Sequence, residues 1–139
     1  MTFAYFNLLG VLIAAVASII LGMVWYGPLF GKLWMKLSGI KMTDKQIQEA
    51  KKKGMTAQMI AAFLGNVVMA VAISVLFSAL GVSSLGAAWA LAVVLWVGFI
   101  LTTTMSGVLW EGKSLSLYSL NNLYTLVHIL MVSAIVYYC

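Results

Sequence analysis

One histidine lies within a stretch that is otherwise apolar enough to cross a membrane. His128 is the sole histidine, and Tyr118, Asn121 and Thr125 precede it at spacings of three and four residues. These spacings place the four side chains on one face of a helix. Because an ionisable residue at membrane depth commonly marks a solute or proton pathway, this polar stripe predicts the lining of a solute path or a proton relay.

The same stripe has a structural interpretation. Asn66 lies at a comparable depth in another apolar stretch, so His128 could bond to Asn66 or to a backbone carbonyl of a neighbouring helix. Desolvation disfavours a charged imidazole unless water or an acid reaches it. A pathway and a structural bond between helices are therefore both open interpretations of His128.

Glu111 follows the third apolar stretch, and Thr104 and Gly107 precede it on the same helical face. Its carboxylate could gate a path or attract cations. It could equally pair with Lys113 or cap the helix that begins near Ser114.

The chain offers little for catalysis or metal binding. Its one cysteine is the last residue, Cys139, far in depth from His128, and its acids are Asp44, Glu49 and Glu111, all outside the apolar stretches. A hydrolase needs a nucleophile, a base and a group that orients the base, and a metal site needs several ligands. We therefore predict no enzyme, no metal and no cofactor.

The composition requires a lipid environment. The 139 residues are 64% hydrophobic and 8% charged, with a mean hydropathy of +1.09. A soluble domain is nearer half apolar and a quarter charged, so this chain could not cover a surface that faces water. The length fits a single transmembrane domain over 1–139.

Four stretches reach the length of about 20 apolar residues that a spanning helix needs. They cover about 3–26, 56–80, 86–110 and 117–138, and none contains Asp, Glu, Lys or Arg. The fold expected is all-α, a four-transmembrane-helix bundle. The links between spans two and three and between spans three and four are short, so each pair should be antiparallel neighbours.

Small residues recur at about every fourth position in three of the spans. The rows are Gly10, Ala14, Ser18 and Gly22 in span one; Ala62, Asn66, Ala70, Ser74 and Ser78 in span two; and Gly86, Ala90, Gly98, Thr102 and Ser106 in span three. Such rows let helix backbones approach closely in lipid. We expect them to face neighbouring helices, in the same chain or in a second copy of a homo-oligomer.

Lysines are concentrated in one connection. Seven of the eight lie between Lys32 and Lys53, and the chain has no arginine. Because positive loops stay inside, the connection 27–55 should be cytoplasmic and both termini outside. The cluster is explained by anionic lipid headgroups rather than by nucleic acid, and it is also a candidate docking site for a protein partner.

The segment after span one stays apolar on one face. Gly27 should end the span and Pro28 should begin the next helix. That helix carries Trp34 on its apolar face and lysines on another, which predicts an amphipathic helix lying flat at the interface. Trp25, Tyr26 and Trp34 would then form an interfacial aromatic belt.

A short polar cytoplasmic helix should follow. Thr43 and Gln46 have the spacing of a capping box, and Gly54 is a natural stop.

Two segments resemble a known family. They are "LGMVWYGPLFGKLWMKLSG" at 21–39, in which residues 25–31 and Trp34 are the most specific part, and "LWEGKSLSLYSLNNLYTLVHIL" at 109–130, in which Glu111 and Asn122 are secondary matches. Over nearly its whole length the chain resembles the small bacterial membrane proteins grouped as domain of unknown function 1761. The resemblance implies an integral membrane protein of the bacterial inner membrane and implies no catalytic residue.

Three function classes remain. A membrane enzyme predicts a ligand or metal near Glu111 or His128, and neither clustering nor spacing favours it. An oligomeric conduit or transporter for a small solute would use the polar stripe on span four and predicts a polar, water-filled cavity. A structural or accessory membrane subunit without transport activity predicts a dry interior and a partner on the lysine-rich connection.

Overall fold

The computed structural model describes residues 8–38, 45, 56–112 and 114–139. Four helical spans are long and apolar enough to cross a membrane, and they cover Leu8–Leu29, Thr56–Leu80, Leu85–Leu109 and Leu115–Tyr138. No strand occurs in these described parts of the chain. The all-helical class and the four apolar spans are therefore confirmed.

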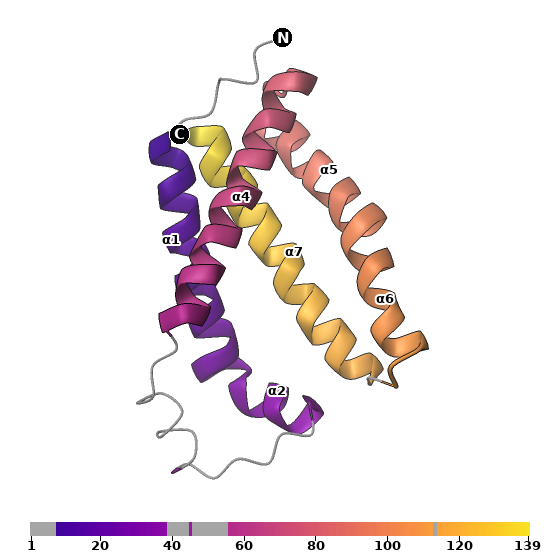
Figure 1. Ribbon diagram of the computed structural model, residues 1–139. Coiled ribbons are helices and arrows are strands. Elements are labelled where there is room, and N and C mark those ends of the chain that lie inside the picture. The colour runs from indigo at the N-terminus through magenta and orange to yellow at the C-terminus, as the bar shows by residue number, and fades with distance from the viewer. Residues whose placement is uncertain (1–7, 39–44, 46–55, 113) are drawn as a thin grey trace.

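Two of the spans contain a π-helical turn. Span one comprises α1 (Leu8–Val24) and the turn η1 (Trp25–Leu29), and α2 (Gly31–Ser38) follows it; span two is α4 (Thr56–Leu80). Span three comprises α5 (Leu85–Leu95), the turn η2 (Trp96–Leu101) and α6 (Thr102–Leu109), and span four is α7 (Leu115–Tyr138). The end of α7 and the first described turn of α1 lie together, opposite the end that carries α2 (Figure 1).

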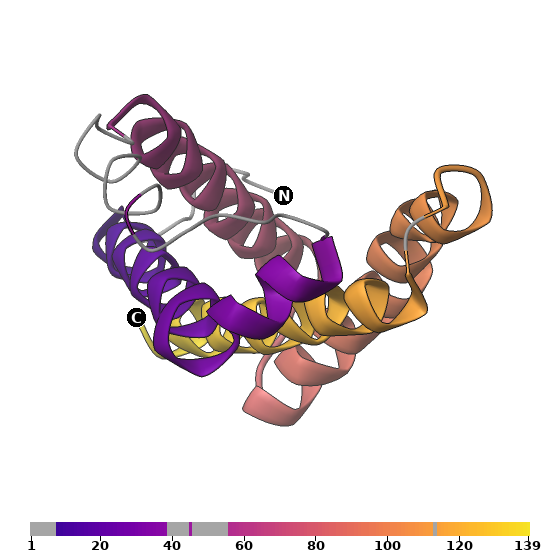
Figure 2. The same ribbon diagram turned by 90° about the horizontal axis from the view of Figure 1, so that it is seen from below.

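Helix α7 lies at the centre of the arrangement. It packs against α1, α4 and span three, and α2 also touches it, whereas α4 packs mainly against α1 and α7. Spans two and three lie close at their connected ends and diverge toward the α2 end (Figures 1 and 2). Spans three and four are neighbours as predicted, but spans two and three are neighbours only near their short connection, because α7 takes the place between them.

The core lies where α1, α4, α5 and α7 meet. Its members are Val11, Ala14, Ala70, Ile73, Phe77, Ala88, Ala92, Ile129 and Val132. Four of them are alanines, and small side chains let helices approach closely enough for dispersion contacts to hold them in lipid. The predicted row of span one contributes to this contact, since Gly10, Ala14 and Ser18 are buried.

The small-residue row predicted for span three does not face the interior. Every member of that row is exposed, namely Gly86, Ala90, Gly98, Thr102 and Ser106. Ala88 and Ala92 are buried in its place. Helix α5 has small residues on two faces. The face with Ala88 and Ala92 turns toward α7, and Trp96 follows on the same face one helical turn later.

The break after span one comes later than predicted. Gly27 and Pro28 lie inside η1, and the chain leaves the helix at Phe30, whose φ is −127°. The Phe30 N–H donates to the Trp25 carbonyl oxygen at 2.8 Å, a bond that spans five residues. Because Pro28 has no N–H to donate, it is tolerated where the four-residue ladder is already interrupted by a π-helical turn.

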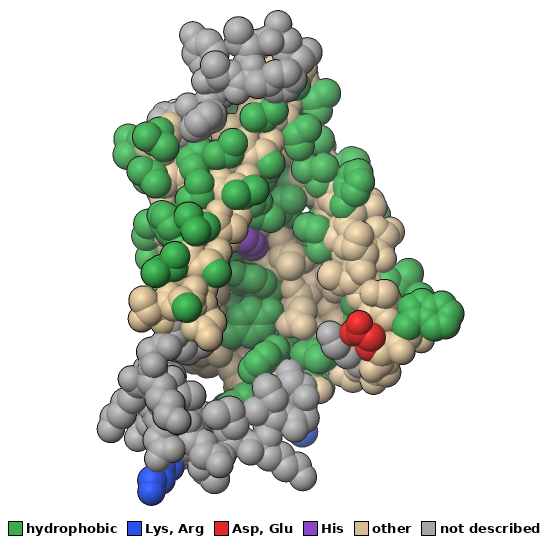
Figure 3. Space-filling view, in the orientation of Figure 1, with side chains coloured by type: hydrophobic (Ala, Val, Ile, Leu, Met, Phe, Trp, Pro, Cys, Tyr) green, Lys and Arg blue, Asp and Glu red, His purple; other side chains and the backbone are tan. Residues whose placement is uncertain are grey.

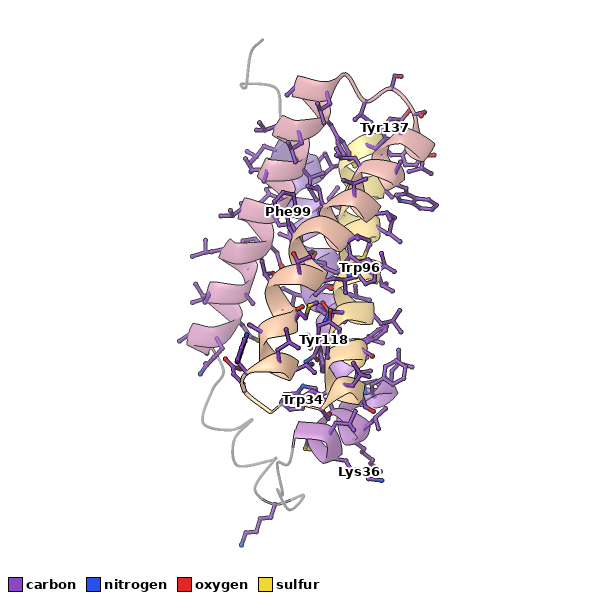
Figure 4. All side chains as sticks on the ribbon, turned by 90° about the vertical axis from the view of Figure 1, so that its right-hand side faces the viewer. Trp34, Lys36, Trp96, Phe99, Tyr118 and Tyr137 are labelled. Carbon is purple, nitrogen blue, oxygen red and sulfur yellow. The ribbon has the colours of Figure 1, made fainter. Side chains whose placement is uncertain are left out.

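Gly31 begins α2 because no side chain fits there. A Cβ atom at Gly31 would lie 2.5 Å from the Tyr26 carbonyl oxygen. Helix α2 then runs across the end of the molecule, where Figure 4 places Trp34 and Lys36. The described charged side chains gather toward this end (Figure 3). The polar helix expected near residues 43–54 lies outside the described residues, apart from Lys45.

Candidate functional site

A cavity of about 320 Å³ lies between α6 and the first half of α7. Its lining residues are Thr104, Ser106, Gly107, Val108, Glu111, Leu117, Tyr118, Asn121, Asn122 and Thr125. The volume falls at the lower end of the range of small-molecule sites. Three members of the polar stripe and Glu111 are thus brought together, whereas His128 and Asn66 are not part of the cavity wall.

Hydrogen bonds across the cavity hold α6 to α7. Thr104 Oγ1 donates to Asn122 Oδ1 at 3.0 Å, and Asn122 Nδ2 donates to the Tyr118 carbonyl oxygen at 2.8 Å. The Thr104 hydroxyl also lies 2.7 Å from the Ile100 carbonyl oxygen, so its single proton is shared between two acceptors. The Tyr118 hydroxyl donates to the Leu101 carbonyl oxygen at 2.9 Å. The Thr104 and Tyr118 side chains are therefore each held by a bond to the facing span.

The turn η2 forms the deep end of this contact. Its first residue, Trp96, donates its indole N–H to the Asn122 carbonyl oxygen at 2.9 Å and to Thr125 Oγ1 at 3.0 Å. Its last residue, Leu101, accepts the bond from Tyr118. Figure 4 shows Trp96 and Tyr118 at different heights along this contact. π-Helical turns are frequent at functional sites, and here both ends of the turn bind α7.

The turn η1 also reaches the cavity wall. The Tyr26 hydroxyl donates to Asn121 Oδ1 at 2.8 Å. Asn121 lines the cavity, and within the described residues its amide nitrogen donates to no neighbour. Span one thus fixes which end of the Asn121 amide is left for a ligand.

His128 lies deeper than the cavity and faces α1. Its Nε2 is 2.8 Å from Ser18 Oγ, and the Ser18 hydroxyl donates to the Ala14 carbonyl oxygen at 2.7 Å. Because the serine proton is used in that bond, the serine oxygen accepts and His128 Nε2 carries the hydrogen. The interhelical partner of His128 is therefore Ser18 rather than Asn66, which is half-buried in α4. Figure 3 shows the histidine deep between α4 and span three.

A column of aromatic rings connects α2 with His128. Successive ring centroids are 5.9 Å apart from Trp34 to Tyr26, 5.1 Å from Tyr26 to Tyr124 and 5.6 Å from Tyr124 to His128. Trp25, expected in the aromatic belt, is buried and packs on Tyr124 at 5.8 Å. The π-helical turn η1 places Trp25 and Tyr26 against Tyr124 of α7. These two rings therefore pack between helices instead of lying wholly at the lipid surface.

Glu111 lines the cavity and is exposed. The N-terminal cap of α7 is formed by Ser114, whose Oγ accepts from the Leu117 N–H at 3.0 Å. Lys113, the partner suggested for Glu111, lies outside the described residues. Across the ranges that the structure describes, no three His, Cys, Asp or Glu residues are placed to hold a metal ion.

Sequence spacing only partly predicts the remaining site residues. Thr104 shares a helical face with Glu111, and Ser18 belongs to the small-residue row of span one. Tyr26 was predicted as an interfacial anchor, but its bond to Asn121 was not. Trp96 was not predicted as a site residue, because spacing along one helix does not show which side chains of another helix reach α7.

Comparison with known proteins gives one match. No curated protein and no solved structure matches the chain significantly. A family described as "Protein of unknown function (DUF1761)" matches residues 9–137, nearly the whole chain. The sequence resemblance is thereby confirmed, and the chain belongs to the DUF1761 family of proteins of unknown function.

Proposed function

We propose that this protein is a conduit or transporter that binds a small polar solute between α6 and α7. The observation that supports the proposal is the cavity of about 320 Å³, on which the side chains of Thr104, Tyr118, Asn121 and Glu111 converge. Polar groups within a membrane span are costly to maintain, and a concave space lined by several of them is a typical solute site. A purely structural network would need no such space.

The proposed orientation follows from charge. Helix α2, which carries Lys32 and Lys36, and the connection from α6 to α7, which carries Glu111, lie toward the same end of the molecule (Figure 1). With the positive connection in the cytoplasm of a bacterial cell, the cavity opens toward the cytoplasm and both termini lie outside. Helix α2 then lies at the cytoplasmic surface of the inner membrane, where its exposed Lys32 and Lys36 reach anionic headgroups.

The proposed path continues along α7 from the cavity toward the opposite face. A solute moving that way meets the Trp96 indole, which closes on Thr125. We place the gate at this contact. The turn η2 lacks the regular hydrogen bonds of an α-helix, so its backbone can rearrange locally without unwinding the whole span. His128 lies beyond this gate and holds α7 to α1 through Ser18.

The test is solute flux into proteoliposomes, measured for three polar two-carbon probes: ethanolamine, ethylene glycol and glycolate. At least one probe should enter faster than into protein-free liposomes. Thr104→Leu should abolish the excess flux because leucine fills the cavity. Thr103→Leu, at the adjacent exposed position, should leave it intact. Folded protein that conducts none of the three probes would contradict the proposal.

A structural subunit is the second candidate, and the exposed small-residue row on span three favours it. This row, from Gly86 to Ser106, offers a smooth surface on which a second copy could pack closely in lipid. We propose a homo-oligomer that uses this surface, with the lysine-rich connection as a docking site for another protein. Gly98→Leu should then lower the mass of the particle in native mass spectrometry, whereas Val97→Leu beside it should not.

A further inference from the structure

The hydroxyl protons around the cavity are already used within the protein. Thr104 donates toward Asn122 and Ile100, Tyr118 donates to the Leu101 carbonyl, and Thr125 donates to the Asn122 carbonyl at 2.8 Å. Ser106 likewise donates to the Thr103 carbonyl at 3.2 Å. Each of these hydroxyls keeps lone pairs, so what it can offer a ligand is an acceptor.

The amides supply the donors of the cavity. The Asn122 side chain makes one bond at each end, from Thr104 to its oxygen and from its nitrogen to the Tyr118 carbonyl, so one N–H of its Nδ2 is left. The oxygen of Asn121 accepts from Tyr26, so both N–H groups of its Nδ2 are left for a ligand. The side-chain donors of the cavity are therefore neutral amides, whereas its hydroxyls and its carboxylate act as acceptors.

The charge of the cavity lining also favours a ligand that donates hydrogen bonds. Glu111 is the only acidic residue among the ten that line the cavity, and none of the ten is basic. A carboxylate has about four acceptor positions, so Glu111 can receive a donor from a ligand while it keeps a protein partner. One carboxylate is too few to replace the water shell of a divalent metal ion, which prefers several oxygen ligands of fixed geometry.

We infer that the solute is a small organic ammonium ion, and this inference rests on the proposed function of the cavity as a solute site. Its N–H groups donate to the hydroxyl oxygens and to Glu111, and its short hydrocarbon part contacts Val108 and Leu117. A hydroxyl or carbonyl oxygen on the same molecule accepts from Asn121 Nδ2. Anions are rejected because Glu111 repels them and no basic side chain among the lining residues offsets that repulsion.

Tyr26 is a positioning residue in this arrangement. It does not contact the ligand itself. It acts through Asn121, whose side-chain oxygen it holds away from the cavity. Without the tyrosine hydroxyl the amide can turn and present its oxygen instead. The side chain of span one thereby sets whether this corner of the cavity donates or accepts.

The binding experiment uses the whole protein in lipid nanodiscs and three probes of nearly equal size. Ethanolamine is a cation at neutral pH, ethylene glycol is neutral and glycolate is an anion. Calorimetry should show ethanolamine binding at least tenfold more tightly than either of the others, since a hydrogen bond to a charged group is the strong kind. Glu111→Gln, an exposed and conservative change, should remove most of that preference, and Ser119→Ala on the outer face of α7 should leave it unchanged.

The outcomes separate the two claims. If ethylene glycol or glycolate binds as tightly as ethanolamine, the ammonium inference is overturned and the cavity remains a solute site. If none of the three binds to correctly folded protein, both claims are overturned. A preference for ethanolamine that Glu111→Gln leaves intact would also overturn the ammonium inference, because the charge would then lie elsewhere.

The role of Tyr26 has its own readout. Ethanolamine should bind the unaltered protein about fivefold more tightly than ethylammonium, which lacks the hydroxyl oxygen that Asn121 Nδ2 bonds. In Tyr26→Phe this ratio should fall toward one, while the preference for cations persists. A merely structural role of Tyr26 would weaken both probes equally, and that result would exclude it as a positioning residue.

Discussion

The two sides of α7 pack against their neighbouring helices with different kinds of side chain. Toward α1 the contact consists of small and branched side chains, with Val11, Ala14 and Val132 almost wholly buried. Toward η2 and α6 the contact includes long polar side chains, among them Trp96 and Tyr118, that reach the backbone of the opposite span. One side is closely packed, and the other borders a partly open cavity of about 320 Å³.

The difference shows how side-chain length decides where a helical membrane protein can hold a ligand. Small residues bring backbones together and leave no space between them. A tyrosine or tryptophan that bonds to the facing backbone keeps the two helix backbones apart by about the length of its own side chain. Space beside that side chain is then closed only partly by neighbours, and the protein can line it with polar groups.

The strongest way to break this comparison is to add volume on each side. Ala14→Leu should lower the free energy of unfolding by about 3 kcal/mol, because Ala14 is fully buried and the added atoms have no room. Denaturation in mixed detergent micelles measures this loss. Val16→Leu, at an exposed position of the same helix, is the matched control and should cost less than about 0.5 kcal/mol.

Added volume on the cavity side should be tolerated much better. Thr104→Leu should cost about 1 kcal/mol, chiefly for the lost bond to Asn122, since the cavity accepts the side chain. Equal losses for Ala14→Leu and Thr104→Leu would show that the two contacts are packed alike.

The second prediction concerns the side chain that holds α7 and span three apart. Trp96→Phe should lower the free energy of unfolding by about 2 kcal/mol, because the Asn122 carbonyl and Thr125 lose their donor and a large ring is replaced by a smaller one. Detergent denaturation again provides the measurement, with Trp89→Phe as the comparison. Trp89 donates to the Leu130 carbonyl at 3.1 Å from an exposed position, so its replacement should cost less.

Much of the closely packed side could be predicted from sequence, because it depends on properties of one helix at a time. The spans follow from the length of apolar chain that lipid requires, and the inward row of span one follows from residues such as Gly10 and Ala14 at helical spacing. The inward face of span three could not be chosen in this way. Ala88 and Ala92 are no smaller than the exposed Gly86 and Ala90, so only the contact with α7 decides between them.

The cavity and the π-helical turns were beyond the reach of sequence patterns for a related reason. A turn such as η2 forms where bonds from its two ends to α7 compensate for its irregular backbone, and periodicity within span three carries no record of those bonds. The partner of His128 had the same ambiguity, because Asn66 and Ser18 both lie in apolar spans within its range of depth. The stripe on span four was found because it lies on one helix, but its division between the cavity and α1 required the fold.

The third prediction sharpens the comparison with the polar pair on the closely packed side. A double-mutant cycle of His128→Leu and Ser18→Ala should give a coupling free energy of about 1 kcal/mol, since the bond lies between two buried side chains. Unfolding of the four proteins in detergent provides the values. A coupling near zero would mean that the bond contributes nothing specific to the contact between α1 and α7.

The smallest effect is expected for the equivalent polar pair on the cavity side. A cycle of Thr104→Val and Asn122→Ala should give a coupling of about 0.5 kcal/mol or less, although its bond length of 3.0 Å is close to that of the His128 pair. Water in the cavity can take the place of the missing partner, whereas Ser18 is buried. A coupling as large as that of the buried pair would show that water does not enter the cavity. Since a polar solute must replace water there, that result would also weaken the case for the solute site.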